Sequence, residues 1–199
     1  VPVPRVSIVG GDDQVGAAGL ALPAQPAVVV TDERGAPLSG VEVVWRVLEG
    51  GGWAEPDRSA TDAEGRAATR WHLGDDFGRH LLLASAAGAE GVTFRAWADL
   101  FFTSVSAGWR HSCGLDAKGW AWCWGDNTWG QLGDGSKTAS PQSRRVSGGR
   151  IFARVEAGNL HSCALTAEGD AFCWGDNGLG QLADGTNTSR PMPGPAGEG

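Results

Sequence analysis

The sequence predicts an all-β protein with two different halves, and three observations lead to this fold class. No window shows a sustained apolar period of about 3.6 residues, so we expect little helix. The 199 residues include 32 Gly and many short apolar runs, which is typical of strands joined by tight turns. The second half repeats a stretch at an offset of 50 residues, whereas the first half has no internal copy. We therefore expect one domain at 1–99 and a second at 100–199, with repeats at about 100–149 and 150–199.

The first half divides into about seven short strands separated by turn clusters. The expected strands lie within 5–11, 24–40, 41–52, 61–74, 79–88 and 91–98. In three of these segments the chain places alternate residues on one face, which period-2 geometry directs into a core between two sheets. The expected core residues are Val41, Val43, Trp45, Val47, Ala67, Thr69, Trp71, Leu73, Phe94, Ala96 and Ala98. This number of strands, with a Trp in a middle strand, fits an immunoglobulin-like (Ig-like) sandwich.

One run in the first half also carries a family resemblance. The pattern D-x-x-G-x-P-x-x-G-V-x-V-x-W extends from Asp32 to Trp45. With the segments that follow it, this run resembles the bacterial Ig-like domain of the invasin and intimin type. The resemblance covers nearly the whole first half and implies a spacer or adhesion module on a bacterial surface. It implies no catalytic residue.

The second half contains two copies of one motif. The stretches 111–135 and 161–185 are identical at 17 of 25 positions, and each copy begins with V-x-A-G-x-x-H-S-C-x-L. A C-W-G-D-N-x-x-G-Q-L core and a trailing proline, Pro141 or Pro191, follow. This repeat resembles that of the regulator of chromosome condensation family, which forms a seven-bladed β-propeller. The resemblance implies one blade per repeat, with Ala183 in the place of Gly133 as a departure from the first copy.

The four cysteines are spaced ten residues apart in each repeat. A three-residue hairpin loop within 116–120, with its glycine left-handed, sets Cys113 opposite Cys123 when residues are paired outward from the turn. Such a non-hydrogen-bonded pair has Cα atoms about 4.5 Å apart, at the short end of what a disulfide tolerates. The second hairpin brings together Cys163 and Cys173 in the same way. Two disulfides are therefore predicted.

Reduced thiols and a zinc site are the alternatives to these disulfides. His111 and His161 each lie two residues before a cysteine, but a zinc site normally uses more closely spaced cysteines. We expect the two histidines to hydrogen-bond backbone within their own blades. Disulfides persist in oxidising compartments, so we expect the periplasm, the cell surface or the medium.

Four tryptophans occur only in the first repeat. They are Trp109, Trp120, Trp122 and Trp129. Tryptophan is enriched at interface hot spots, so these residues mark either a partner-binding surface or a surface that packs on the first domain. Trp124 and Trp174 are common to both repeats and are expected to pack within the blades.

Two blades make an incomplete propeller, because a ring needs about four to eight blades and each blade needs a neighbour on both faces. The sequence ends at a position equivalent to Gly149. We expect one of three situations: further repeats in a parent chain, several chains that pool their blades, or docking on another protein. Each of them covers exposed apolar faces.

Composition and motifs exclude several function classes. The net charge is −7 and the 16 basic residues are scattered, which argues against nucleic acid as a partner. No apolar segment approaches the ~20 residues that span a membrane. No nucleophile elbow, phosphate-binding loop or metalloprotease motif occurs, so we expect no enzyme, no cofactor and no metal site.

The expected function is that of a non-catalytic extracytoplasmic scaffold. The Ig-like spacer carries disulfide-stapled blades that dock on a protein partner or a larger envelope assembly. Two alternatives remain at this stage. One is a secreted enzyme inhibitor or regulator, because the propeller family includes a β-lactamase inhibitor. The other is a surface adhesin that binds glycan through the Trp-rich repeat.

Overall fold

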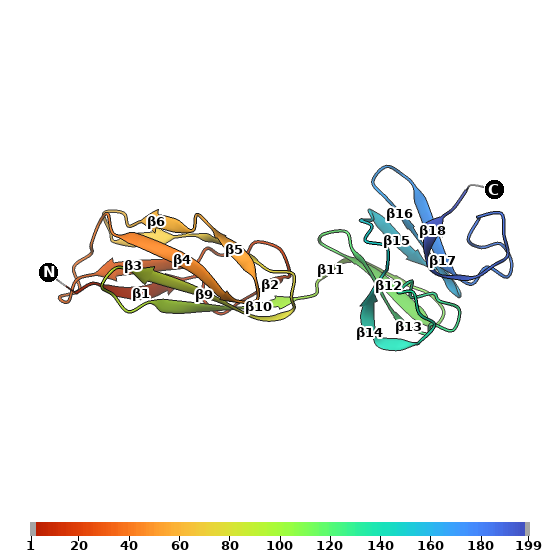
Figure 1. Cartoon of the computed structure of the whole chain (residues 1–199), viewed down its shortest axis with the longest axis horizontal. Helices are drawn as coiled ribbons and strands as arrows, with labels where there is room; N and C mark the ends of the chain where they lie inside the picture. Colours follow the sequence, from red (N-terminus) through yellow and green to blue (C-terminus); the bar gives the residue numbers. More distant parts are fainter. Residues whose placement is uncertain (1–2, 198–199) are drawn as a thin grey trace. The chain divides into compact units, whose positions relative to one another are not determined.

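The structure is a computed structural model that describes residues 3–197. It divides into two compact units, Val1–Leu100 and Phe101–Gly199. Val1, Pro2, Glu198 and Gly199 belong to the expected domains but lie outside the described residues. Every regular element that the structure describes is a β-strand (Figure 1), which confirms the all-β prediction.

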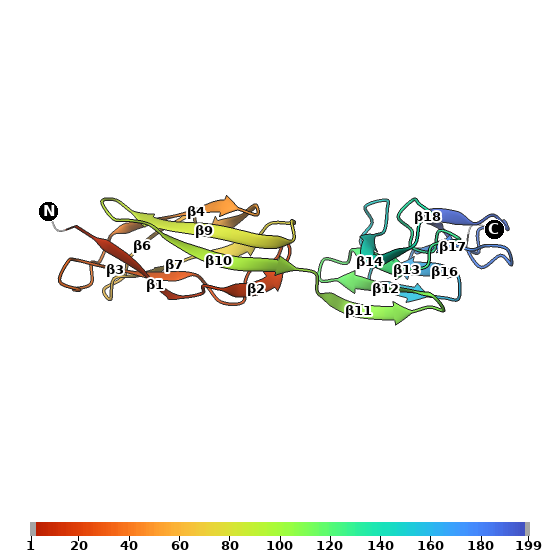
Figure 2. The same cartoon turned by 90° about the horizontal axis from the view of Figure 1, so that it is seen from below.

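The first unit is a sandwich of two main sheets. A three-stranded sheet has the order β1 (Arg5–Gly10), β3 (Ala27–Thr31) and β7 (Arg66–Ala68). A five-stranded sheet has the order β2 (Gln14–Ala17), β10 (Val92–Asp99), β9 (Gly78–Ala86), β4 (Glu42–Glu49) and β6 (Arg58–Ala60). A short pair joins β5 (Gly52–Glu55) to β8 (Arg70–Leu73). Strands β4, β9 and β10 lie side by side in Figure 2, and β2 joins β10 in parallel at the edge.

The predicted alternation of apolar residues is confirmed in this unit. Val43 and Trp45 of β4 are buried, as are Trp71 and Leu73 of β8. The last strand, β10, buries Phe94, Ala96 and Ala98 and exposes the residues between them. These residues belong to one core cluster between the sheets, so the first half has the Ig-like sandwich architecture expected for it.

The strand count differs from the prediction, because the described residues of this unit form ten strands and not about seven. The segment 66–73, expected as one strand, is divided between β7 and β8, which belong to different sheets. Thr69 lies at the crossing point. Its backbone N–H donates to Pro26 O (3.1 Å) and its hydroxyl donates to Pro56 O (2.7 Å), so it leaves both ladders while remaining buried.

The second unit consists of two four-stranded antiparallel sheets, one for each repeat. The first contains β11 (Phe102–Ala107), β12 (His111–Asp116), β13 (Ala121–Gly125) and β14 (Ser140–Arg145) in sequence order. The second contains β15 (Arg154–Ala157), β16 (His161–Leu165), β17 (Ala171–Gly175) and β18 (Arg190–Pro195) in the same order. A single core cluster contains residues from both sheets, so the repeats pack face to face.

The β12–β13 hairpin has the register predicted from its turn. Asp116 N–H donates to Trp120 O (3.0 Å), and Cys113 pairs with Cys123. Gly119 has a φ of +79°, in the left-handed region that favours glycine. The second repeat pairs Cys163 with Cys173 in the same way.

Candidate functional site

The candidate site is the pair of sheet surfaces through which one repeat contacts the next. We call the side of a sheet that carries the cysteines its front face and the opposite side its back face. In the first repeat the front face includes Leu115 and Ala121, which pair across β12 and β13. In the second repeat the back face includes Ala164 and Phe172, which pair across β16 and β17. These four residues are buried in one shared cluster, so the first front face covers the second back face.

Both front faces carry a disulfide. Cys113 is bonded to Cys123 and Cys163 to Cys173, with Cα atoms 4.1 Å apart in each pair. The sulfurs of each pair are bonded to one another and are not thiolates in this structure. Each bridge closes a ten-residue separation within one hairpin and joins two neighbouring strands of the same sheet.

A buried polar cluster connects the two sheets. Ser162 Oγ donates to Gln131 O (3.0 Å) and lies 2.8 Å from His111 Nε2, which therefore donates to Ser162. Trp174 Nε1 donates to the same carbonyl of Gln131 (2.9 Å). The expectation that His111 bonds backbone within its own blade is wrong, because its partner is a hydroxyl of the other repeat. The His–Ser pair is buried, so it is a packing contact without access for a substrate.

Burial also affects the titration of His111. Desolvation lowers its pKa to about 4, repulsion from His161 acts in the same direction, and the charge of Asp126 opposes them. The side chain is consequently neutral at neutral pH. The pKa of His161 is lowered as well, first by desolvation, with Asp176 opposing.

A second polar contact lies between the first strands of the two sheets. Ser106 Oγ donates to Glu156 Oε2 (3.0 Å) and accepts the backbone N–H of Ala157 (3.0 Å). A hydrogen bond from Arg154, followed by that from Ser106, lowers the pKa of Glu156, so its carboxylate is charged. This contact adds a second polar link between the repeats to the one around Ser162.

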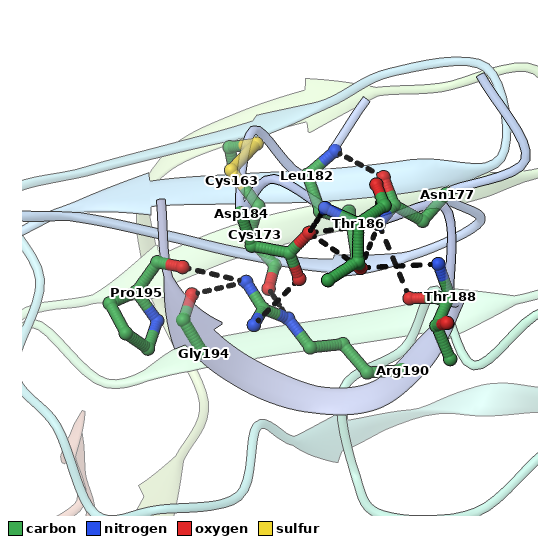
Figure 3. Close-up of polar contacts among 10 residues, drawn as sticks. All are labelled: Cys163, Cys173, Asn177, Leu182, Asp184, Thr186, Thr188, Arg190, Gly194 and Pro195. Carbon is green, nitrogen blue, oxygen red and sulfur yellow. Dashed lines mark hydrogen bonds and ion pairs between the residues drawn. A yellow bond between two sulfur atoms is a disulfide. The ribbon is translucent and has the colours of Figure 1, made fainter. Parts of the chain in front are cut away.

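A buried asparagine organises the long loop of each repeat. In the second repeat, Asn177 Oδ1 accepts the backbone N–H of Leu182 (2.9 Å), as Figure 3 shows. Its Nδ2 atom donates to Asp184 Oδ1 (3.1 Å), Thr186 O (3.0 Å) and Thr188 O (3.3 Å). Asn127 makes the equivalent bonds in the first repeat. The sequence indicated turn formers at these positions but not that one amide would hold a whole loop.

Arg190 fastens the same loop to the last strand. Its guanidinium lies 3.2 Å from Asp184 Oδ2 and donates to Cys173 O (3.0 Å), Gly194 O (2.8 Å) and Pro195 O (2.9 Å) (Figure 3). This arginine belongs to the second repeat only, because its equivalent is Ser140. Sequence reasoning did not single it out.

The outer faces of the sheet pair expose residues whose equivalents are buried between the repeats. Val155 on the second back face is 4% exposed, whereas its equivalent Val105 is 59% exposed. Leu115 on the first front face is 4% exposed, whereas its equivalent Leu165 is 39% exposed. The back face of the first repeat and the front face of the second repeat are therefore exposed, whereas the equivalent face of the other repeat is covered.

The four tryptophans that occur only in the first repeat do not form one surface. Trp109 (67% exposed) and Trp129 (42% exposed) lie in the loops where the backbone of Asp126 bonds that of Arg110. Trp120 lies at the opposite end of the hairpin, about five residues or 16 Å along the strands.

The other two tryptophans have partners within the sheet. Arg145 stacks over the Trp120 ring at 3.5 Å. Trp122 Nε1 donates to Asp116 Oδ2 (2.9 Å). Trp109 and Trp129 are thus the two most exposed members of the predicted set.

A metal cluster and a membrane-spanning helix have requirements that the described part of the chain does not meet. Within residues 3–197, no group of three or more His, Cys, Asp or Glu side chains is placed to hold a metal ion. No helix of membrane-spanning length and apolarity occurs over the same residues.

Comparison with protein families identifies the repeat. A model described as the regulator of chromosome condensation (RCC1) repeat matches residues 102–131 and again 152–181. A second model of the same description matches residues 118–165, from the end of one hairpin turn into the next repeat. A search of the curated proteins found no match to this chain.

Several solved structures are similar to parts of the chain. Human WBSCR16 is 21% identical, with a TM-score of 0.46, over 59% of this chain and 37% of its own. Prp20p from Saccharomyces cerevisiae is 14% identical, with a TM-score of 0.46, over 85% of this chain and 48% of its own. The D00-D0 domain of intimin is 19% identical, with a TM-score of 0.33, over 46% of this chain and 45% of its own. The chain thus spans less than half the length of these proteins. Residues 102–181 match the RCC1 repeat twice, with one four-stranded sheet for each repeat.

Proposed function

We propose that this chain is a non-catalytic, extracytoplasmic protein-interaction subunit in which the first unit is a spacer. The back face of the first repeat and the front face of the second repeat are the surfaces that dock on protein. The observation that carries this proposal is the exposure of Val105 and Leu165 at positions that the packing between repeats buries. Apolar side chains exposed on an open sheet face favour docking, because each Å² of apolar surface that is buried contributes about 25 cal/mol.

The two disulfides support the extracytoplasmic part of the proposal. Each bridge joins a pair of cysteines in a hairpin, and no cysteine remains free in the described residues. Protein disulfides of this structural kind form and persist in oxidising compartments. The periplasm, the cell surface and the medium are the compartments that fit.

Trp109 and Trp129 extend the proposed docking surface beside the first repeat. Both lie in loops and both have exposed rings, with the Arg110 guanidinium 5.6 Å from the Trp109 ring. Large aromatic residues that lose their water on binding account for much of the energy at protein interfaces. We assign these two tryptophans to partner contact and leave Trp120 and Trp122 to the sheet surface.

Site-specific photo-crosslinking in the producing cell tests the docking faces. A photoreactive amino acid replaces Val105 or Leu165, and a control replaces the exposed Gln142 of β14. We expect discrete protein adducts from the first two positions and none from the control. Equal labelling from all three positions, or no adducts from Val105 and Leu165, would overturn the proposal.

Thiol labelling before lysis tests the compartment. Intact cells are treated with a permeant alkylating reagent, and the extracytoplasmic fraction is then separated. Two intact bridges in a protein recovered from that fraction are the expected result. A protein recovered from the cytoplasm with four alkylated cysteines would contradict the assignment.

A further inference from the structure

The loop that follows each buried asparagine has glycine at position 133 of the first repeat and alanine at the equivalent position 183 of the second. Gly133 has a φ of +70° and its N–H donates to Gly130 O (3.0 Å). Ala183, its equivalent, has a φ of +51° and its N–H donates to Gly180 O (3.1 Å). The two residues therefore occupy the same position in the same turn. Gly133 is buried and Ala183 is exposed, because only the first loop is covered by another repeat.

The residue that covers Gly133 is a tryptophan of the neighbouring back face. A methyl group at Gly133 would lie 2.6 Å from Trp174 Nε1 and 2.9 Å from its Cδ1 atom. Trp174 cannot easily yield, since it is fully buried and its Nε1 is bonded to Gln131 O. A tryptophan-bearing back face therefore requires glycine at this point of the front face.

The front face of the second repeat has alanine at this point. Elsewhere on this face, His161 is equivalent to His111 and Leu165 is equivalent to Leu115, with the same residue type in each pair. If the first repeat of a second copy docked its back face here, the ring of its Trp124, the equivalent of Trp174, would collide with the Ala183 methyl group. Both tryptophans lie beside the equivalent phenylalanine of their own repeat: the ring centroids are 5.3 Å apart for Trp124 and Phe102 and 6.4 Å apart for Trp174 and Phe152.

The backbone at Ala183 provides independent support for a role. A φ of +51° lies in the left-handed region, where alanine is disfavoured and glycine is free of strain. The methyl group therefore opposes the turn that it occupies. It also makes no packing contribution to the covered interface between the repeats, because it is exposed on the outer face.

We propose that Ala183 is a specificity-determining residue on the front face of the second repeat. It excludes a second copy of this chain and admits a sheet of the same repeat type that carries a residue smaller than tryptophan at the position of Trp174. This inference rests on the proposed function, because it assumes that the second front face is a docking surface. Docking of one copy on the next would be head to tail, which generates rings or filaments when nothing prevents it.

Sedimentation velocity over a protein concentration series tests the proposal with the full chain. Ala183→Gly removes the methyl group and is expected to self-associate at least about tenfold more tightly than the natural sequence. Ala183→Ser retains a Cβ atom and is the matched control, which should behave as the natural sequence does. Adding Val105→Glu to Ala183→Gly places a charge on the opposing back face and should restore the natural behaviour.

Two results would overturn the proposal. One is that Ala183→Gly and the natural sequence self-associate with the same dissociation constant, whether that constant is high or low. The other is association of Ala183→Gly that Val105→Glu leaves intact, because the contact would then use other surfaces. Crosslinking from Leu165 separates this failure from that of the proposed function. If Leu165 still gives adducts while Ala183→Gly behaves as the natural sequence does, the second front face is a docking surface but Ala183 does not determine its specificity.

Discussion

The loop asparagine of the second repeat allows a quantitative prediction. Asn177→Ala removes the acceptor of the buried Leu182 N–H, which costs about 1–3 kcal/mol when no other partner replaces it. The carbonyls of Thr186 and Thr188 lose a donor but belong to exposed residues, so water compensates most of that loss. The smaller alanine side chain also leaves a cavity that its neighbours fill only in part, which lowers the free energy of unfolding further. We expect the free energy of unfolding of the second unit to fall by about 2–4 kcal/mol.

Urea unfolding followed by tryptophan fluorescence, together with amide exchange at Leu182, measures this effect. For a unit of this size, the loss lowers the unfolding temperature by at least about 8 °C. Asn187→Ala is the matched control, because Asn187 is an exposed residue of the same loop and its replacement should change stability by less than about 0.5 kcal/mol. A loss below about 1 kcal/mol with unchanged protection of the Leu182 amide would refute the reasoning.

Three further predictions concern the bridges, the buried histidine and the exposed tryptophans. Replacing Cys163 and Cys173 together by Ala should destabilise the second unit by about 2.7 kcal/mol on the chain-entropy model, as measured by urea unfolding. Protonation of His111 favours the unfolded chain because its folded pKa is about 4 and its unfolded value about 6.5, so stability is full above pH 6.5 and falls by up to about 3 kcal/mol towards pH 4. His111→Gln should flatten that part of a stability-against-pH profile, and an unchanged slope would exclude His111 as its source. Trp109→Ala and Trp129→Ala should each change stability by less than about 0.5 kcal/mol yet reduce the yield of adducts in the crosslinking assay.

The local parts of this fold were accessible from the sequence. The pairing of Cys113 with Cys123 follows from a short turn and the two-residue period of a strand, so it depends on ten neighbouring residues only. The same is true of the alternating core residues of β10, such as Phe94 and Ala96. A strong local pattern fixes which side chains share a face, whatever the rest of the chain does.

The parts that escaped prediction depend on contacts between distant segments. His111 finds a hydroxyl 51 residues away, and no spacing within one repeat indicates which face of the next repeat it meets. Thr69 leaves the ladder because two prolines from other turns supply its hydrogen-bond acceptors. Arg190 joins the loop at Asp184 to the strand at Cys173, and these two groups come together only when the sheet has formed. Such choices are set by tertiary packing and not by period or composition.

The short span of each disulfide bears on how the four thiols find their partners. Four cysteines can be joined in three ways, and both wrong pairings must link thiols at least 40 residues apart, against ten for Cys113–Cys123 and Cys163–Cys173. Closing the fourfold longer loop costs about 1.2 kcal/mol more in chain entropy. Each hairpin can consequently close its own bridge without the other, and chain entropy favours the native connectivity over both alternatives.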